Sequence, residues 1–294
     1  MARVVIVGCG VVGAMLAYEL GQSGLEVCVL DQQSPAQGST GAALGVLMGI
    51  ISHKVKGRSW RLRETSLHRY ETLIPELEER LGRKLAFNRQ GVLNLCFDAA
   101  ELPRWQSLQQ IRQTQGYTLE IWTPAQVAKA CPHLALGNVA AGIYSPQDRQ
   151  IDPTALTLAL VEAAQQQGVH FQWDHSVTGI DSLPSGGVAV HTPQKTLEAD
   201  SAILAAGIGT TTLTQQLNQP IEISPVLGQA LRLQLPAPLG NPQFQPVING
   251  NDVHLVHLGQ GSYWVGATVE FPAETDPQWL LVEQRQQELL DAVL

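Results

Sequence analysis

The stretch RVVIVGCGVVG at residues 3–13, followed by Glu26–Leu30 and Asp31, decides the fold. Its β-branched beginning predicts a short strand that is buried on both faces. The glycines that follow have the spacing G-x-G-x-x-G, and helix-forming residues come directly after them. The apolar run Glu26–Leu30 predicts a second strand, which ends at an acid. Strand, glycine turn, helix, strand and acid in this order predict a βαβ unit that binds a dinucleotide.

Each part of this motif has a physical role. Gly8 allows the tight turn, Gly10 lets a pyrophosphate approach the backbone, and Gly13 lets the helix pack closely on the strand. The start of the helix offers free N–H groups and a positive dipole end to the phosphates. A carboxylate at Asp31 can accept hydrogen bonds from both ribose hydroxyls and disfavours a 2′-phosphate. NADP is therefore disfavoured, whereas FAD and NAD both remain.

The composition excludes several classes of protein. The 294 residues suggest about two domains. The net charge of −8 argues against a nucleic-acid binder, and no apolar run reaches the ~20 residues of a membrane span. We find no secretory leader, and the cysteines at 9, 28, 96 and 131 lack the Cys-x-x-Cys spacing of a zinc site or a dithiol motif. These features predict a reduced, cytoplasmic chain without a metal site.

The segment after Asp31 is small and hydroxylated, and it includes Ser39-Thr40-Gly41-Ala42-Ala43-Leu44-Gly45. Such a loop can bring backbone N–H groups and hydroxyls against a phosphate or a planar ring. Together with the glycine motif, this loop resembles the glycine oxidase/D-amino-acid oxidase group of FAD-dependent oxidoreductases. The resemblance continues in the family's order at Arg89-Gln90-Gly91-Val92-Leu93, Ile151-Asp152-Pro153, ADSAILAAG at 199–207, Pro225-Val226-Leu227-Gly228-Gln229 and Val265-Gly266-Ala267-Thr268.

The resemblance implies a cofactor and its contacts. It implies FAD, bound non-covalently by the glycine turn and by a set of residues elsewhere in the chain. Contacts to the dinucleotide are expected at Val11, Val12, Asp31 and Gln32, with Val177 touching adenine through its backbone. Phosphate and ring contacts are expected at Ser39, Thr40, Leu44, Gly45 and Val46. The strand that ends at Ala206 and Gly207 is expected to pass beneath the cofactor.

The order of the expected elements predicts an α/β fold with two interleaved domains. A Rossmann-type FAD-binding domain is expected at 1–82 and 139–215, and an antiparallel-sheet substrate domain at 83–138 and 216–294. Apolar spacing predicts a helix over 60–81 that is interrupted or bent at Pro75. Apolar positions in 278–294 predict a last helix with no stop signal after it. By the resemblance, an Arg-Pro strand for the substrate carboxylate and a glycine-rich segment would follow, so we expect the sequence to stop short of the family's usual end.

On the substrate side, the chain departs from the family pattern. His254-Leu255-Val256-His257-Leu258 stands where the family has a tyrosine and a Val-Pro-Arg turn. His254, at the tyrosine's place, is a candidate catalytic and substrate-binding residue, and Arg232 is a candidate cation for the substrate. A histidine packed within its strand and an exposed strand arginine are the simpler interpretations. His254 and His257 lie three apart on a strand and so point to opposite faces, which argues against a metal site.

The resemblance implies oxidation of the C–N bond of a small amine or amino acid. Hydride would pass to flavin N5, water would hydrolyse the imine, and dioxygen or another acceptor would take the electrons. A homo-oligomer is compatible with the sequence. Two alternatives stay open: an NAD-dependent dehydrogenase using the same motif, and a flavin-binding, non-catalytic subunit or scaffold. The short end and the altered 254–258 stretch motivate the second alternative.

Overall fold

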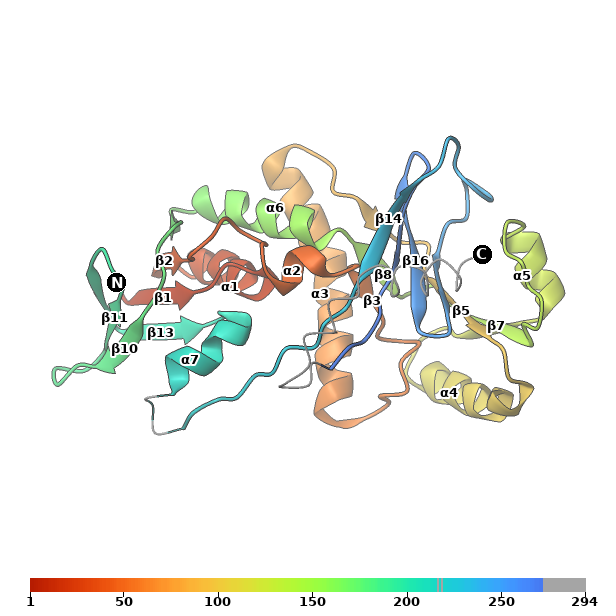
Figure 1. Cartoon of the computed structure of the whole chain (residues 1–294), viewed down its shortest axis with the longest axis horizontal. Coiled ribbons are helices and arrows are strands. Elements are labelled where there is room, and N and C mark those ends of the chain that lie inside the picture. Colours follow the sequence, from red (N-terminus) through yellow and green to blue (C-terminus); the bar gives the residue numbers. More distant parts are fainter. Residues whose placement is uncertain (216, 218, 272–294) are drawn as a thin grey trace. The chain divides into compact units, whose positions relative to one another are not determined.

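The computed structural model describes residues 1–215, 217 and 219–271, which divide into two compact units (Figure 1). The first unit comprises Met1–Ala43, Leu73–Ala86 and Asp152–Pro225. The second comprises Leu44–Thr72, Phe87–Ile151 and the described residues from Val226 onward. Each unit is therefore assembled from three separate segments of the chain.

A parallel four-stranded sheet forms the centre of the first unit. Its order is β13 (Ser201–Leu204), β1 (Arg3–Val7), β2 (Glu26–Leu30) and β9 (His170–Gln172). Helices α1 (Val11–Gln22) and α6 (Pro153–Gln165) pack against each other. Four of the five residues of β1 are buried, as expected for a strand covered on both faces. The predicted Rossmann-type arrangement is confirmed.

Shorter elements complete the first unit. An antiparallel meander consists of β10 (Gly179–Ser182), β11 (Val188–His191) and β12 (Thr196–Ala199). Helix α2 (Ser39–Ala42) follows β2, and a 3₁₀ turn (Gly207–Gly209) with α7 (Thr210–Thr214) follows β13.

The second unit contains a seven-stranded sheet. Its order is β14 (Ala230–Gln234), β17 (Ser262–Gly266), β16 (Val253–Gly259), β15 (Val247–Gly250), β5 (Val92–Cys96), β7 (Ala141–Ser145) and β6 (Glu120–Trp122). Neighbouring strands are antiparallel except β15 and β5, which run parallel. A small antiparallel sheet joins β3 (Val46–Leu47), β8 (Arg149–Ile151) and β4 (Phe87–Asn88). The unit also contains helices α4 (Leu102–Thr114) and α5 (Pro124–Ala130), and Thr123 and Gln126 form a capping box at the start of α5.

The structure differs from the sequence expectations in three places. Helix α3 (Gly57–Leu81) is not interrupted at Pro75, one of the two outcomes expected there. A proline in a helix interior costs about 3 kcal/mol, and burial of Leu73, Ile74 and Leu77 around it offsets that cost. The sheet of the second unit, expected to be antiparallel, contains one parallel pair, β15 with β5.

The third difference concerns the borders of the two units. Residues 44–72 and 139–151 group with the second unit, although they were expected in the first domain. Strand pairing explains this, because β3 and β7 pair with β8, β5 and β6 rather than with the parallel sheet. The helix expected over 278–294 lies outside the described residues. Among the residues that are described, none of the helices combines the length and the apolarity that a bilayer span needs.

Candidate functional site

The glycine turn after β1 is tightly constrained by the backbone around it. Gly8 has φ +101°, a conformation that costs other residues steric strain. A Cβ at Gly8 would lie 2.5 Å from the Ala205 carbonyl oxygen, and a Cβ at Gly13 only 1.9 Å from the Gly8 carbonyl oxygen. Both positions therefore require glycine because backbone atoms occupy the space that a side chain would need.

Asp31 ties the end of β2 to this turn. Its Oδ2 accepts a hydrogen bond from the Cys9 N–H (2.6 Å), and its Oδ1 accepts one from the Gln33 N–H (2.9 Å). A carboxylate has about four lone-pair positions, so these two bonds leave acceptor capacity on Asp31. Burial, and to a lesser extent the Asp31 charge, raise the pKa of the Cys9 thiol to about 12. Cys9 is therefore a protonated packing residue at neutral pH.

The start of α1 is held by a side chain from the next loop. Thr40 Oγ1 accepts a hydrogen bond from the Val11 N–H (3.0 Å) and would lie 2.9 Å from a Cβ at Gly10. Gly10 is the N-cap of α1 and provides no side-chain cap, and Val12 is exposed. The first turn of this 12-residue helix thus presents N–H groups beside a hydroxyl, which is the chemistry of an anion site.

The other sequence-predicted residues fall into two groups. In the first unit, Gln32 and Ser39 are exposed, Val177 and Ala206 are half-buried against the cluster around Val5, Val7 and Leu30, and Gly207 is exposed. In the second unit, Leu44 is buried, and the Gly45 carbonyl accepts a hydrogen bond from Ile151 N–H (3.1 Å). Val46 pairs with Gln150. The structure thus brings Gly8, Gly10, Val11, Gly13, Asp31 and Thr40 together in one unit.

A buried carboxylate that the sequence analysis missed holds the turn after β3. Asp148 is fully buried, and its Oδ1 accepts hydrogen bonds from the N–H groups of Gly49 (2.7 Å) and Ile50 (2.8 Å). Its Oδ2 accepts one from the Ile51 N–H (2.8 Å). Burial raises the pKa of Asp148, and these three N–H groups oppose that effect because they favour the carboxylate.

A buried arginine holds the same turn by donating hydrogen bonds to the carbonyl groups of the turn. Arg112 on α4 donates from Nε to the Ile50 carbonyl (2.7 Å) and from Nη2 to the Ser52 carbonyl (2.6 Å). Its guanidinium carbon lies 3.8 Å from the centre of the Trp60 ring, within the range of a cation–π interaction. Asp148 and Arg112 therefore fix the N–H and C=O groups of one short turn without contacting each other through a direct hydrogen bond.

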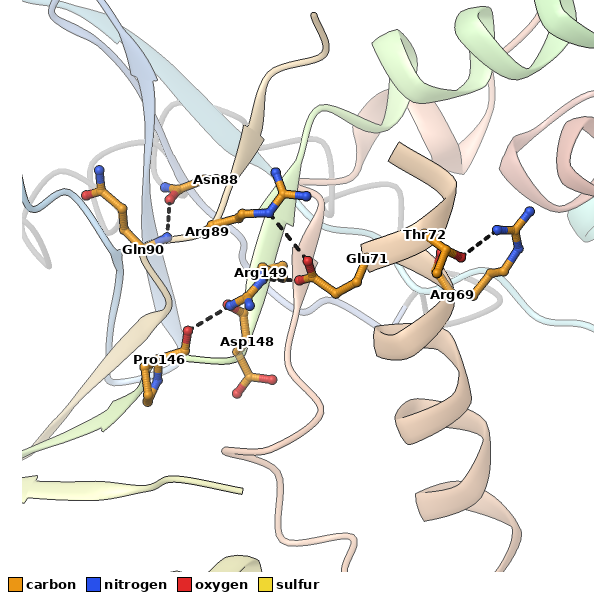
Figure 2. Close-up of polar contacts among 9 residues, drawn as sticks. All are labelled: Arg69, Glu71, Thr72, Asn88, Arg89, Gln90, Pro146, Asp148 and Arg149. Carbon is orange, nitrogen blue, oxygen red and sulfur yellow. Dashed lines mark hydrogen bonds and ion pairs between the residues drawn. The ribbon is translucent and has the colours of Figure 1, made fainter. Parts of the chain in front are cut away.

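Figure 2 shows that the neighbours Asp148 and Arg149 point in different directions. Arg149 Nε lies 2.6 Å from Glu71 Oε1, and Arg89 Nε lies 3.4 Å from Glu71 Oε2. The Glu71 side chain is 41% exposed, so this ion-pair cluster remains in contact with water. It differs from the buried contacts of Asp148, whose carboxylate points away from the cluster.

His254, the candidate residue, and His257 lie on opposite faces of β16, as the strand period requires. His254 is half-buried, its Nδ1 is enclosed by protein, and burial lowers the pKa of its imidazole. Two asparagines that the sequence analysis missed are in register beside it: Asn249 pairs with His254, and Asn94 pairs with Asn249. Arg232 is an exposed residue of strand β14, at the edge of the described sheet.

His257 belongs to a separate aromatic cluster. Its ring centre lies 5.1 Å from that of Tyr263 and 6.2 Å from that of His133. Burial, and then the proximity of His133, lower the pKa of His257 to about 4. The imidazole is therefore neutral at pH 7. The described residues contain no cluster of three or more histidine, cysteine or acidic side chains suited to a metal ion.

Comparison with known proteins shows which family and which proteins this chain is similar to. A family model described as "DAO: FAD dependent oxidoreductase" matches residues 3–294. Mitochondrial dimethylglycine dehydrogenase from Rattus norvegicus is 31% identical over 213 residues, which cover 70% of this chain and 23% of that protein. The bifunctional protein ThiO/ThiG from Synechocystis sp. is 32% identical over 271 residues, covering 91% of this chain and 38% of that protein. The chain thus spans well under half the length of these two relatives.

A solved structure shares the fold. The crystal structure of glycine oxidase from Geobacillus kaustophilus superposes with a TM-score of 0.84 at 24% sequence identity. The match covers 94% of this chain and 74% of that chain.

Proposed function

We propose, from the premise that this chain belongs to the DAO family of FAD dependent oxidoreductases, that it oxidises the C–N bond of a small amine or amino acid. FAD is the cofactor of this family. The relatives named above include a dimethylglycine dehydrogenase and a glycine oxidase, whose substrates by name share an amine next to a small carbon skeleton. The observation that carries the proposal is the glycine turn with its free helix start beside Thr40.

The residues of the first unit fit the dinucleotide part of FAD. Gly8 and Gly13 leave no room for a side chain. Gly10 has no side chain that would block a pyrophosphate from the N–H groups of α1. We assign the holding of FAD to the following residues: Gly8, Gly10, Val11, Val12, Gly13, Asp31, Gln32, Ser39, Thr40, Leu44, Gly45, Val46, Val177, Ala206 and Gly207. Asp31 would use its remaining lone pairs for ribose hydroxyls while holding the turn through Cys9.

When bound, FAD supplies the acceptor for the hydride that leaves the substrate carbon, and water hydrolyses the resulting imine. The protein's own contribution is binding, orientation and exclusion of water. We assign most contacts with FAD to the first unit, and those of Leu44, Gly45 and Val46, together with substrate binding, to the second. His254 would contact the amine, and Arg232 would offer a cation to an anionic substrate group. Dioxygen or another acceptor would take up the electrons.

The first experiment is the visible spectrum of the purified protein before and after addition of FAD. Anaerobic addition of glycine, sarcosine, dimethylglycine, D-amino acids and proline, one at a time, follows. We expect a flavin spectrum and its bleaching by at least one of these amines. A yellow protein that none of them bleaches would contradict the amine substrate. A protein that takes up no FAD would contradict the cofactor assignment and return NAD to consideration.

A further inference from the structure

Three polar residues form a straight row across neighbouring strands of the second unit. Asn94 on β5 is in register with Asn249 on β15, which is in register with His254 on β16. Each of them lies two residues along its strand from a valine, and these three valines pack in one apolar cluster: Val92, Val247 and Val256. Residues two apart on a strand point to the same face, so all three polar residues share the face of that cluster. Side chains directly opposite each other on paired strands have Cβ atoms about 5 Å apart, within reach of a hydrogen bond.

The hydrogen bonds at one end of the row fix the orientation of each amide. Asn94 Nδ2 donates to the Leu95 carbonyl (3.4 Å), so Asn94 Oδ1 is the atom that accepts. Asn249 Nδ2 donates to Asn94 Oδ1. Asn249 Nδ2 is thereby engaged, and Asn249 Oδ1, which can only accept, is left for another partner.

The next two atoms in the row lack partners among the described residues. Asn249 is 7% exposed, and its Oδ1 is enclosed without a hydrogen bond. Nδ1 of His254 is likewise enclosed and without a partner. An unmade hydrogen bond to a buried polar atom costs about 1–3 kcal/mol, so joining these two atoms would satisfy both. Because Asn249 Oδ1 can only accept, a histidine nitrogen that bonds to it must carry the proton.

We propose that Asn94 and Asn249 hold His254 in the tautomer protonated at Nδ1, so that the lone pair on Nε2 accepts a proton from the ammonium group of the amine substrate. The N–H bond of the ammonium breaks, a bond between Nε2 and hydrogen forms, and no electrons are exchanged. The neutral amine is the form that can release hydride, and the imidazolium later returns its proton to water. This role of Nε2 rests on the proposed function, whereas the tautomer does not. Asn94 and Asn249 are positioning residues.

The charges around His254 suit a neutral imidazole. Asp252, on the turn before it, favours the charged form, but burial has the larger effect and lowers the pKa of His254. On β17, the residue in register with His254 is Gly266, which has no side chain. Asn249 on β15 is uncharged, and Arg232 on β14 is exposed and two strands away. His254 is therefore neutral at pH 7, and its tautomer decides which nitrogen can act as a base.

The tautomer can be measured directly in the holoprotein by ¹H–¹⁵N NMR of ¹⁵N-histidine-labelled chain. The two ring nitrogens of a neutral imidazole differ strongly in ¹⁵N shift, and the His254→Gln variant assigns the signal. We expect His254 with its proton on Nδ1. A proton on Nε2 would overturn the proposed hydrogen-bond relay from Asn94 through Asn249 to His254, whatever the activity. The signals of His133 and His257 provide internal controls, because neither lies in the row.

Two nearly isosteric variants separate the relay from a packing effect. Asn249→Leu removes the acceptor, so we expect His254 to change to the Nε2-protonated tautomer and amine-induced bleaching to slow by about tenfold or more. Asn249→Asp keeps an acceptor, so the Nδ1 proton should stay, while the added negative charge raises the His254 pKa. The bleaching rate should then fall at a correspondingly higher pH than in the wild type.

The outcomes distinguish the two proposals. If the Nδ1 tautomer is present but no amine bleaches the flavin, the proposed function fails and the relay stands. If amines bleach the flavin while Asn249→Leu leaves both the tautomer and the pH profile unchanged, the relay is wrong and the proposed function stands.

Discussion

In the first unit, the buried polar side chains among the described residues are threonines, whereas the second unit buries Arg112, Asp148, Asn249 and His257. Three of these threonines, at 157, 192 and 214, donate to a backbone carbonyl within four residues of themselves. Asp148 instead accepts from N–H groups 97 to 99 residues away, and Arg112 donates to carbonyl groups about sixty residues away.

This difference determines how strongly the stability of each unit depends on single buried polar side chains. A hydroxyl bonded to a carbonyl within its own helix or turn is satisfied wherever that local structure forms, so its loss leaves few other groups without partners. A buried carboxylate that closes a distant turn leaves several backbone donors without partners when it is removed. We therefore expect substitutions of buried polar groups to cost far more in the second unit than in the first.

Asp148→Ala tests this expectation and should have the largest effect. The change leaves the N–H groups of Gly49, Ile50 and Ile51 buried without an acceptor, and it leaves the charge of Arg112 without its nearby counter-charge. We expect the free energy of unfolding to fall by roughly 4 kcal/mol or more, measured by urea unfolding followed by circular dichroism.

Thr157→Val is the matched control for Asp148→Ala. Thr157 is fully buried, but its hydroxyl donates only to the Pro153 carbonyl one turn earlier (2.7 Å). We expect a loss of about 1 kcal/mol. Equal losses in the two variants would contradict the contrast between the units.

Gly13→Ala probes a place where the first unit should tolerate substitution as poorly as the second unit does. The new Cβ would lie 1.9 Å from the Gly8 carbonyl oxygen, so α1 must move away from the turn. We expect a loss of about 3 kcal/mol in unfolding free energy, together with weaker uptake of FAD, measured by flavin fluorescence. Gly179→Ala is the control, because its Cβ would meet only the His191 ring, at 3.9 Å. Normal FAD uptake by Gly13→Ala would contradict the assigned role of the turn.

The same contrast explains what the sequence could reveal. The glycine turn and Asp31 lie within about thirty residues of each other, so a local motif predicts them. The strands of the parallel sheet are recognised from their apolar pattern. Asp148 and Arg112 have no such signal, because their partners are backbone groups that carry no residue identity. The parallel pairing of β15 with β5 depends on residues some 155 positions apart. Asn249 was likewise missed, because its significance lies only in its register with Asn94 and His254.

The buried His257 of the second unit should make the free energy of unfolding depend on pH. Its pKa falls from 6.5 to about 4 on folding, because the folded chain buries it neutral. Below pH 6.5 the unfolded state binds a proton that the folded state does not, so the stabilisation is present above pH 6.5 and is lost as the pH falls toward 4. Between pH 6.5 and 5 the wild type should lose roughly 1.5 kcal/mol more than His257→Leu.

Urea unfolding of both proteins across this pH range measures the difference, and the histidines that do not lie beside His257 cancel in the comparison. Parallel curves for the wild type and His257→Leu would show that His257 takes up its proton in the folded state.

Glu71→Gln should have the smallest effect, although it removes a charge that contacts two arginines in the second unit (Figure 2). Glu71 is 41% exposed, so water screens its attraction to Arg89 and Arg149 and would solvate the arginines after the change. We expect a loss below about 1 kcal/mol, and a smaller one in high salt. Arg149 also donates to the Pro146 carbonyl (2.7 Å) and stays in place. A loss as large as that of Asp148→Ala would mean that distance along the chain, rather than burial, sets the cost of breaking a polar contact in this unit.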